Sequence, residues 1–186
     1  MQFHRCYING MQDTMAIWEA GLVYCSYCEI RGSVDFIYGG GPAFHSCNIK
    51  QERATGSVNT APRHPLSMPY GFVFNACKIN KPPASEPSNC TLMRPGAITA
   101  RRAYINYTMD NHITAHRLGR VGRSRSQPAA RPSMAARRST GATIDLSKRA
   151  SWVRRLDRLE GDGLFGDNVL RQLGAPSLIH LYTPLR

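Results

Sequence analysis

The sequence predicts an all-β protein in which short coils of chain stack on one another as a β-solenoid. Three observations support this: a Cys-x-Ile motif recurs, an aromatic residue precedes most copies at a fixed distance, and Gly-rich corners separate short apolar segments. The copies begin at Cys6, Cys28, Cys47 and Cys77. Residues two apart in a strand point to one face, so each Cys/Ile pair can enter a shared interior. Each coil is then stabilised by its neighbours.

The repeat also predicts where the coils lie. Phe3, Phe44 and Phe74 each stand three positions before a repeat cysteine. A fifth, degraded copy is expected over residues 104–109, with Tyr107 as its last rung. The alternative is a chance recurrence of Cys-x-Ile in a β-sandwich, although the flanking aromatic residues recur too.

Variable spacing between the copies predicts loops. Residues 51–70 and 80–91 contain prolines and are expected to bulge from the solenoid. Residues 117–150 are rich in Arg, Ser, Ala and Pro without a clear period, and are expected to be disordered. Residues 151–173 have only a weak helical pattern, interrupted by glycines, and no further coil is expected there. The predicted organisation is therefore a partial β-helical domain over 1–116 and a basic, largely disordered tail over 117–186.

Composition limits the function classes. The formal charge of +12 belongs mainly to residues 117–186, which hold 14 Lys/Arg against 5 Asp/Glu. Clustered arginine can bind nucleic acid nonspecifically, which remains an alternative, but no recognised binding motif is present. No apolar run reaches the length of a membrane span, and the first residues show no secretory signal. The cysteines fit a buried column better than a disulfide framework, and no metal site or cofactor is expected.

Two acidic residues stand at equivalent positions of successive repeats. Asp13 and Asp35 are 22 residues apart, the same offset that relates Cys6 to Cys28. If each repeat is one coil, these carboxylates lie on adjacent coils about 4.8 Å apart, the spacing of neighbouring strands. Two such groups do not ionise together easily, so one is expected to stay protonated near neutral pH. The alternative is that both are turn residues with solvated side chains.

The two acids also lie in motifs that resemble a known family. Residues 10–14 (GMQDT) and 34–39 (VDFIYG) resemble the two central signatures of the pectinesterases, or pectin methylesterases. The segment from Arg94 through residues 104–106 to 109–113 is similar to a third. The likeness covers about residues 3–115. It implies a right-handed parallel β-helix that hydrolyses methyl esters of polygalacturonate, here truncated at both ends.

The resemblance implies a role for each site residue. Asp35 would be the nucleophile, Asp13 the general acid and base, Gln12 a ligand of the oxyanion, and Arg94 the group that keeps Asp35 ionised and oriented. The chemistry is consistent, because Asp35 could attack the ester carbonyl while Asp13 protonates the departing methoxide. An amide of Gln12 could stabilise the negative charge that develops on the carbonyl oxygen.

Aromatic side chains beside the acids are candidates for sugar contacts. Phe36 and Tyr38 are expected to line substrate subsites. The expected partner is methyl-esterified pectin (homogalacturonan), without a membrane or specific nucleic acid, and the protein is expected to be a monomer. By resemblance it would act outside the cell or in the cell wall.

The sequence also departs from the family pattern. Gly96 and Met93 stand where the family has Trp and Gly around the motif arginine, and the upstream segment with another glutamine has no counterpart. An inactive pectin-binding remnant is therefore an alternative. The likeness stops near His116, and reading residues 117–122 one base later can give Gly-Trp-Asp-Gly-Leu-Gly, close to the family continuation. We therefore hypothesise that residues 117–186 are translated out of frame.

Overall fold

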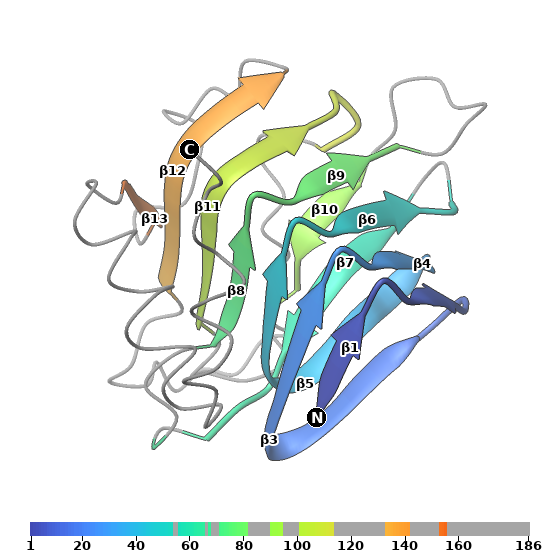
Figure 1. Cartoon of the computed structure of the whole chain (residues 1–186). Helices are drawn as coiled ribbons and strands as arrows, with labels where there is room; N and C mark the ends of the chain where they lie inside the picture. Colours follow the sequence, from blue (N-terminus) through green and yellow to red (C-terminus); the bar gives the residue numbers. More distant parts are fainter. Residues whose placement is uncertain are drawn as a thin grey trace, which may run out of the picture.

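The strands in the described part of the chain form one parallel sheet that curls back on itself (Figure 1). The computed structural model describes residues 1–53, 56–65, 67, 71–81, 90–94, 101–113, 133–141 and 153–155, the last two ranges and residues 19, 20 and 101 by their backbone alone. The strands in these ranges are β1 Gln2–His4, β2 Tyr7–Asn9, β3 Met15–Ser26, β4 Glu29–Gly32, β5 Val34–His45, β6 Asn48–Gln51, β7 Val58–Pro62, β8 Phe72–Asn75, β9 Lys78–Asn80, β10 Thr91–Met93, β11 Arg101–Met109, β12 Ser133–Gly141 and β13 Val153–Arg155.

A sharp corner recurs once in every coil and divides the sheet into two arms. On one side β1, β3, β5 and β8 pair in parallel, and on the other β2, β4, β6 and β9 do. β11 bends at Asn106 and pairs with both β8 and β9. The prediction of stacked coils, including a fifth over residues 104–109, is confirmed.

A residue with a left-handed backbone conformation forms each corner. It comes directly before the repeat cysteine, or before Tyr107 in the fifth coil. Its φ lies between 48° and 54° at Arg5, Tyr27, Ser46, Ala76 and Asn106. Such a conformation costs a non-glycine residue roughly 1–2 kcal/mol. Backbone hydrogen bonds between coils offset this cost, because the corner N–H donates to the next coil, as from Tyr27 to the carbonyl of His45 at 3.0 Å.

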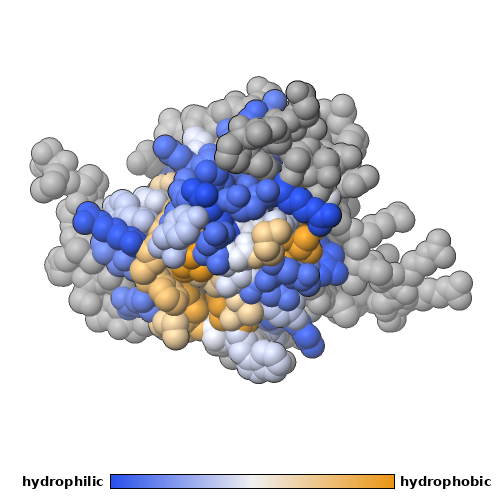
Figure 2. Space-filling model, turned by 90° about the vertical axis from the view of Figure 1, so that its right-hand side faces the viewer, coloured by the Kyte–Doolittle hydropathy of each residue, from blue (hydrophilic) through white to orange (hydrophobic). Residues whose placement is uncertain are grey.

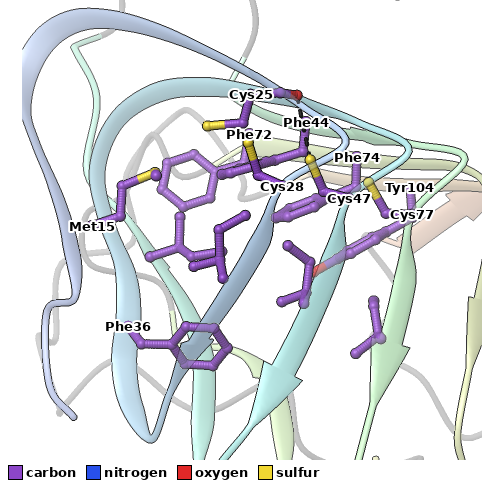
Figure 3. Close-up of a cluster of buried hydrophobic side chains, with 14 of the residues drawn as sticks. Met15, Cys25, Cys28, Phe36, Phe44, Cys47, Phe72, Phe74, Cys77 and Tyr104 are labelled. Atoms are coloured by element: carbon purple, nitrogen blue, oxygen red, sulfur yellow. Dashed lines mark hydrogen bonds between the residues drawn. The ribbon is translucent and has the colours of Figure 1, made fainter. Parts of the chain in front are cut away.

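Two columns of side chains fill the interior next to these corners (Figure 3). Cys28, Cys47 and Cys77 are almost fully buried on successive coils, and all six cysteines are free. The rings of Phe44 and Phe74 stack with centroids 4.8 Å apart, as do those of Phe74 and Tyr104. These distances match the spacing of adjacent strands, so the stacking follows directly from the parallel register. The prediction of a buried cysteine column is confirmed.

One segment expected to be a loop contains a strand. Within residues 51–70, β7 pairs with β5 on one side and with β10 on the other. Val58 and Thr60 are β-branched and favour an extended backbone. Pro62 comes at the last position of the strand, where it can end the pairing without interrupting it. The expectation of a loop is therefore wrong for residues 58–62; residues 82–89 of the second expected loop lie outside the described part.

Residues 117–150 are expected to be disordered and residues 151–173 to form no further coil, but each of these ranges contains one strand. β12 pairs in parallel with β11, from Arg101 opposite Ser133 to Met109 opposite Gly141. β13 then pairs with β12. The remaining residues of 117–186 lie outside the described part, and so do the other predictions made for them.

The first coil is less completely covered than those that follow. Phe3, Cys6 and Ile8 are only partly buried, whereas Cys28 and Ile30 on the next coil are buried. Figure 2 shows a face of the molecule on which hydrophobic residues lie between hydrophilic ones. The described part of the chain has no helix that is long and apolar enough to span a membrane.

Candidate active site

Asp13 and Asp35 have the same backbone conformation on adjacent coils. Their φ angles are 47° and 48°, in the left-handed region that Asp tolerates better than most residues. The register between the coils follows the 22-residue offset, with a parallel bridge from Gln12 to Val34. The N–H of Asp13 donates to the carbonyl of Val34 at 3.2 Å. The prediction that the two acids occupy equivalent places on neighbouring coils is confirmed for the backbone.

The glycine before each acid is required by close packing. A Cβ on Gly10 would lie 2.8 Å from Oγ1 of Thr14. A Cβ on Gly32 would lie at the same distance from that atom and would overlap the Cβ of Phe36. The shared Gly-x-x-Asp pattern therefore reflects the same tight local structure in both coils. This structure places an acid at the equivalent point of each coil.

The carboxylate of Asp35 is buried and paired with Arg94. Only 3% of the Asp35 side chain is exposed, against 54% for Arg94. Nε of Arg94 donates to Oδ1 of Asp35 at 3.3 Å, and Nη2 donates to Oδ2. The N–H of Arg94 in turn donates to the carbonyl of Thr60 at 2.9 Å, which fixes the residue at the end of β10. A buried carboxylate needs such a partner, because removing an ion from water is costly.

Arg94 interacts with both acids of the pair. Its bond to Asp35 raises the pKa of its guanidinium, and the charges of Asp35 and Asp13 act in the same direction. The guanidinium therefore stays positively charged and lies within electrostatic range of Asp13. Asp13 itself is exposed. The two acids thus differ in environment: Asp35 is buried in a two-pronged ion pair, and Asp13 is open to solvent.

The remaining predicted residues fall into two groups. Gln12 is exposed beside Asp13, and Tyr38 is half-buried on β5, where its hydroxyl accepts a hydrogen bond from Arg63 at 3.2 Å. Phe36, however, is fully buried in the core (Figure 3). The expectation that Phe36 lines a sugar subsite is therefore wrong. The left-handed turn at Asp35 and the register shift between Val34 and Ile37 break the alternation of β5, so Phe36 faces inward.

Sequence reasoning missed two exposed residues near the site. Trp18 follows the acid of the first motif on β3 and is 83% exposed. Arg63 follows β7, which had been expected to be a loop. The alternation of Met15, Ala16 and Ile17 could have placed Trp18 on the outer face. In the residues that the structure describes, no group of His, Cys, Asp or Glu is arranged to hold a metal ion.

The arrangement provides the parts of a nucleophilic carboxylate site. Arg94 leaves lone pairs free on both oxygens of Asp35, because each carboxylate oxygen can accept two hydrogen bonds. The neighbouring acid Asp13 is open to solvent, and Gln12 brings an amide donor beside it. On this ground the molecule is a parallel β-helix with a candidate hydrolytic centre made of two carboxylates and an arginine.

Comparison with known proteins identifies the family. A family model described as Pectinesterase matches residues 1–157, and the chain belongs to this family. The match extends past residue 116, where the resemblance seen in the sequence ends. Pectinesterase A of Emericella nidulans is 31% identical over 149 residues, covering 79% of this chain and 44% of that protein. The chain thus spans less than half the length of this relative.

Solved structures agree on the fold. Pectin methylesterase from carrot superposes with a TM-score of 0.77 at 19% identity, covering 96% of this chain and 59% of the other. A pectin methylesterase in complex with hexasaccharide VII superposes with a TM-score of 0.66 at 20% identity, covering 91% of this chain and 56% of the other. At these identities the likeness shows the fold alone. The prediction of a pectinesterase-type parallel β-helix is confirmed.

Proposed function

We propose that the protein hydrolyses methyl esters of galacturonate units in pectin and releases methanol. Asp35 is the nucleophile, Asp13 the general acid and base, Arg94 the group that orients Asp35, and Gln12 a donor to the oxyanion. The observation that supports this best is the buried carboxylate of Asp35, with both oxygens bonded to Arg94, one coil away from an exposed acid in the same backbone conformation.

The first half of the reaction forms an acyl-enzyme. An oxygen of Asp35 attacks the ester carbonyl carbon, and the carbonyl electrons move onto its oxygen, beside the Gln12 amide. The bond to the methoxy oxygen then breaks as protonated Asp13 donates its proton to that oxygen. Methanol leaves, and the galacturonyl carbon is bonded to Asp35 as an anhydride.

The second half regenerates the enzyme. Asp13, now ionised, accepts a proton from a water molecule, whose oxygen attacks the anhydride. The bond to Asp35 breaks, and the galacturonic acid unit that is released loses its remaining proton to solvent and becomes a carboxylate. Asp35 leaves as a carboxylate again, and Arg94 stabilises it in this form. Asp13 is again protonated, so one water is consumed for each methanol formed.

The test replaces each acid by its isosteric amide. Asp35→Asn should abolish methanol release from highly methylated pectin, because an amide is not a nucleophile at neutral pH. Asp13→Asn should lower the rate by about 10²–10⁴-fold, the usual contribution of a general acid or base. Asp110→Asn is the control, because this acid lies after β11 and accepts a hydrogen bond from the N–H of Lys81. If Asp35→Asn retains the wild-type rate, Asp35 is not the nucleophile.

Family membership also supports a proposal about place of action. We propose that the protein works outside the cell or in the cell wall, where its polymeric substrate lies. Detection of the protein only inside cells that express it natively would contradict this.

A further inference from the structure

The outer face of β3 has exposed side chains, and the half-buried Tyr38 lies beside it on β5. On β3, Met15 and Ile17 are buried, whereas Ala16 and Trp18 are exposed. Ala16 is the register partner of Tyr38 on β5. Tyr38 comes three residues after Asp35, and three residues of extended chain span at most about 11 Å. A polysaccharide bound at Asp35 would therefore reach this face.

Trp18 projects from this face at an irregularity of β3. Ile17 pairs with Gly39, but the next paired residue is Leu22, opposite Gly41. The chain approaches itself closely at this irregularity, since a Cβ on Gly21 would lie 2.8 Å from the carbonyl oxygen of Trp18. The indole is 83% exposed. An exposed aromatic ring offers a ligand a broad apolar surface.

Arg63 lies on the other side of Tyr38. Its N–H donates to the carbonyl of Gly39 at 2.7 Å, and its Nη1 donates to the Tyr38 hydroxyl at 3.2 Å. The residue is exposed. One contact anchors the backbone of Arg63 to β5, and the other positions its guanidinium beside Tyr38. A guanidinium binds carboxylates in a two-pronged geometry.

We infer that Trp18 and Arg63 form a subsite for an unesterified galacturonate unit near the ester that is hydrolysed. The inference rests on the proposed function, because it assumes that the polymer crosses Asp35. A galacturonate ring has an apolar C–H face that can stack on the indole. Its free carboxylate carries the charge that Arg63 attracts, and a methyl-esterified or amidated unit lacks that charge. The subsite therefore distinguishes a free acid from an ester.

Binding of two uncleavable probes to the full wild-type chain tests the inference. One is hexagalacturonate without methyl groups, and the other is the same hexasaccharide with every carboxyl group amidated, which is uncharged and is not an ester. Arg63→Ala should weaken binding of the acidic probe about tenfold and change that of the amidated probe less than about twofold. Trp18→Ala should weaken both probes to a similar degree. Calorimetric titration measures both affinities.

Two control variants come from the other arm of the helix. Tyr7→Ala removes an exposed aromatic residue from β2, and Lys78→Ala removes an exposed cation from β9. Neither should alter the affinity of either probe. Circular dichroism checks that every variant folds, and Arg63→Lys, which keeps the charge, should lose less affinity for the acidic probe than Arg63→Ala.

The inference is overturned if Arg63→Ala weakens both probes equally or neither, if Trp18→Ala has no effect, or if the folded wild-type chain does not bind hexagalacturonate. Methanol release by the same wild-type chain is measured separately. The expected binding pattern without methanol would support the subsite and contradict the proposed esterase activity. Methanol release without the binding pattern would contradict the subsite alone.

Discussion

The guanidinium of Arg94 donates to both carboxylate oxygens of Asp35, a residue 59 positions earlier in the chain. The pair connects the start of β5 to the end of β10, across β7, which pairs with both strands. The contact therefore depends on the correct stacking of three strands. The Arg94–Asp35 pair therefore contributes both to the stability of these strands and to the orientation of the proposed nucleophile.

Two substitutions of Arg94 test separately the positive charge of its side chain and its two-pronged contact with Asp35. Arg94→Ala leaves a buried carboxylate without its partner, and we expect it to lower the free energy of unfolding by about 1–3 kcal/mol. It should also lower methanol release by at least about a hundredfold, since Asp35 loses its orientation. Arg94→Lys keeps the positive charge but lacks the two-pronged guanidinium. It should therefore restore the free energy of unfolding more fully than the rate of methanol release. Denaturant unfolding and initial rates measure the two effects. Equal rates in wild type and Arg94→Ala would contradict the assigned role.

Gly32 should tolerate no side chain. In Gly32→Ala the new methyl group would overlap the Cβ of Phe36, a buried core residue. We expect a loss of about 1–3 kcal/mol or more, the usual cost of overpacking. Gly56→Ala is the control, because no atom lies within 4 Å of its added Cβ and only its positive φ of 65° opposes the substitution. Chemical denaturation compares the two. A Gly32→Ala variant as stable as Gly56→Ala would show that the chain at Gly32 has room for a methyl group.

Acid should destabilise the fold through two histidines. Burial lowers the pKa of His45 and that of His112 to about 4 in the folded chain. In the unfolded chain these groups titrate near pH 6.5. Below pH 6.5 the unfolded state therefore binds more protons, so stability should fall as the pH drops from about 6.5 to 4. Thermal melts across this range measure the slope.

A substitution that cannot titrate identifies the source of this pH dependence. His112→Leu should flatten the fall in melting temperature between pH 6.5 and 4. His4→Leu, at an exposed position on β1, serves as the control and should not flatten it. An unchanged slope in His112→Leu would contradict the assignment to His112.

The coding DNA tests the origin of residues 117–186. We predict that a reading frame shifted by one base after residue 116 encodes Gly-Trp and further coils of the family pattern. The structure places β12 and β13 within the present frame, so the test decides between two explanations of this segment. An early stop codon or the absence of further coils in the shifted frame would exclude the out-of-frame hypothesis.

Repeat spacing predicted the fold because parallel stacking places equivalent residues in register. The 22-residue offset was sufficient to locate Asp13 beside Asp35, and Cys-x-Ile was sufficient to locate the corners. Spacing could not predict that Asp35 would be buried and Asp13 exposed, because that depends on Arg94, which reaches Asp35 from a distant strand. The expectation that Phe36 lines a subsite rested only on its place beside Asp35, and it was wrong. A period of two fails where a left-handed residue and a register shift turn the strand, as they do at Asp35.

The positions of Trp18 and Arg63 on the outer face were not predicted, for a similar reason. Pro62 suggested a loop, although it stands at the end of β7, and this concealed the position of Arg63. Trp18 lies at an irregularity inside β3 that interrupts the pairing with β5. Neither residue belongs to the repeated motif. Their positions depend on how three strands pair, which the sequence pattern alone does not specify.

The most direct test is whether the full chain releases methanol from highly methylated pectin and forms one new carboxylate for each methanol. Alcohol detection and base consumption at constant pH measure the two products together. The proposed esterase predicts equal amounts, with none from heat-denatured protein. Absence of both products, from a chain shown to be folded by circular dichroism, would contradict the account and favour an inactive pectin-binding relative of the family.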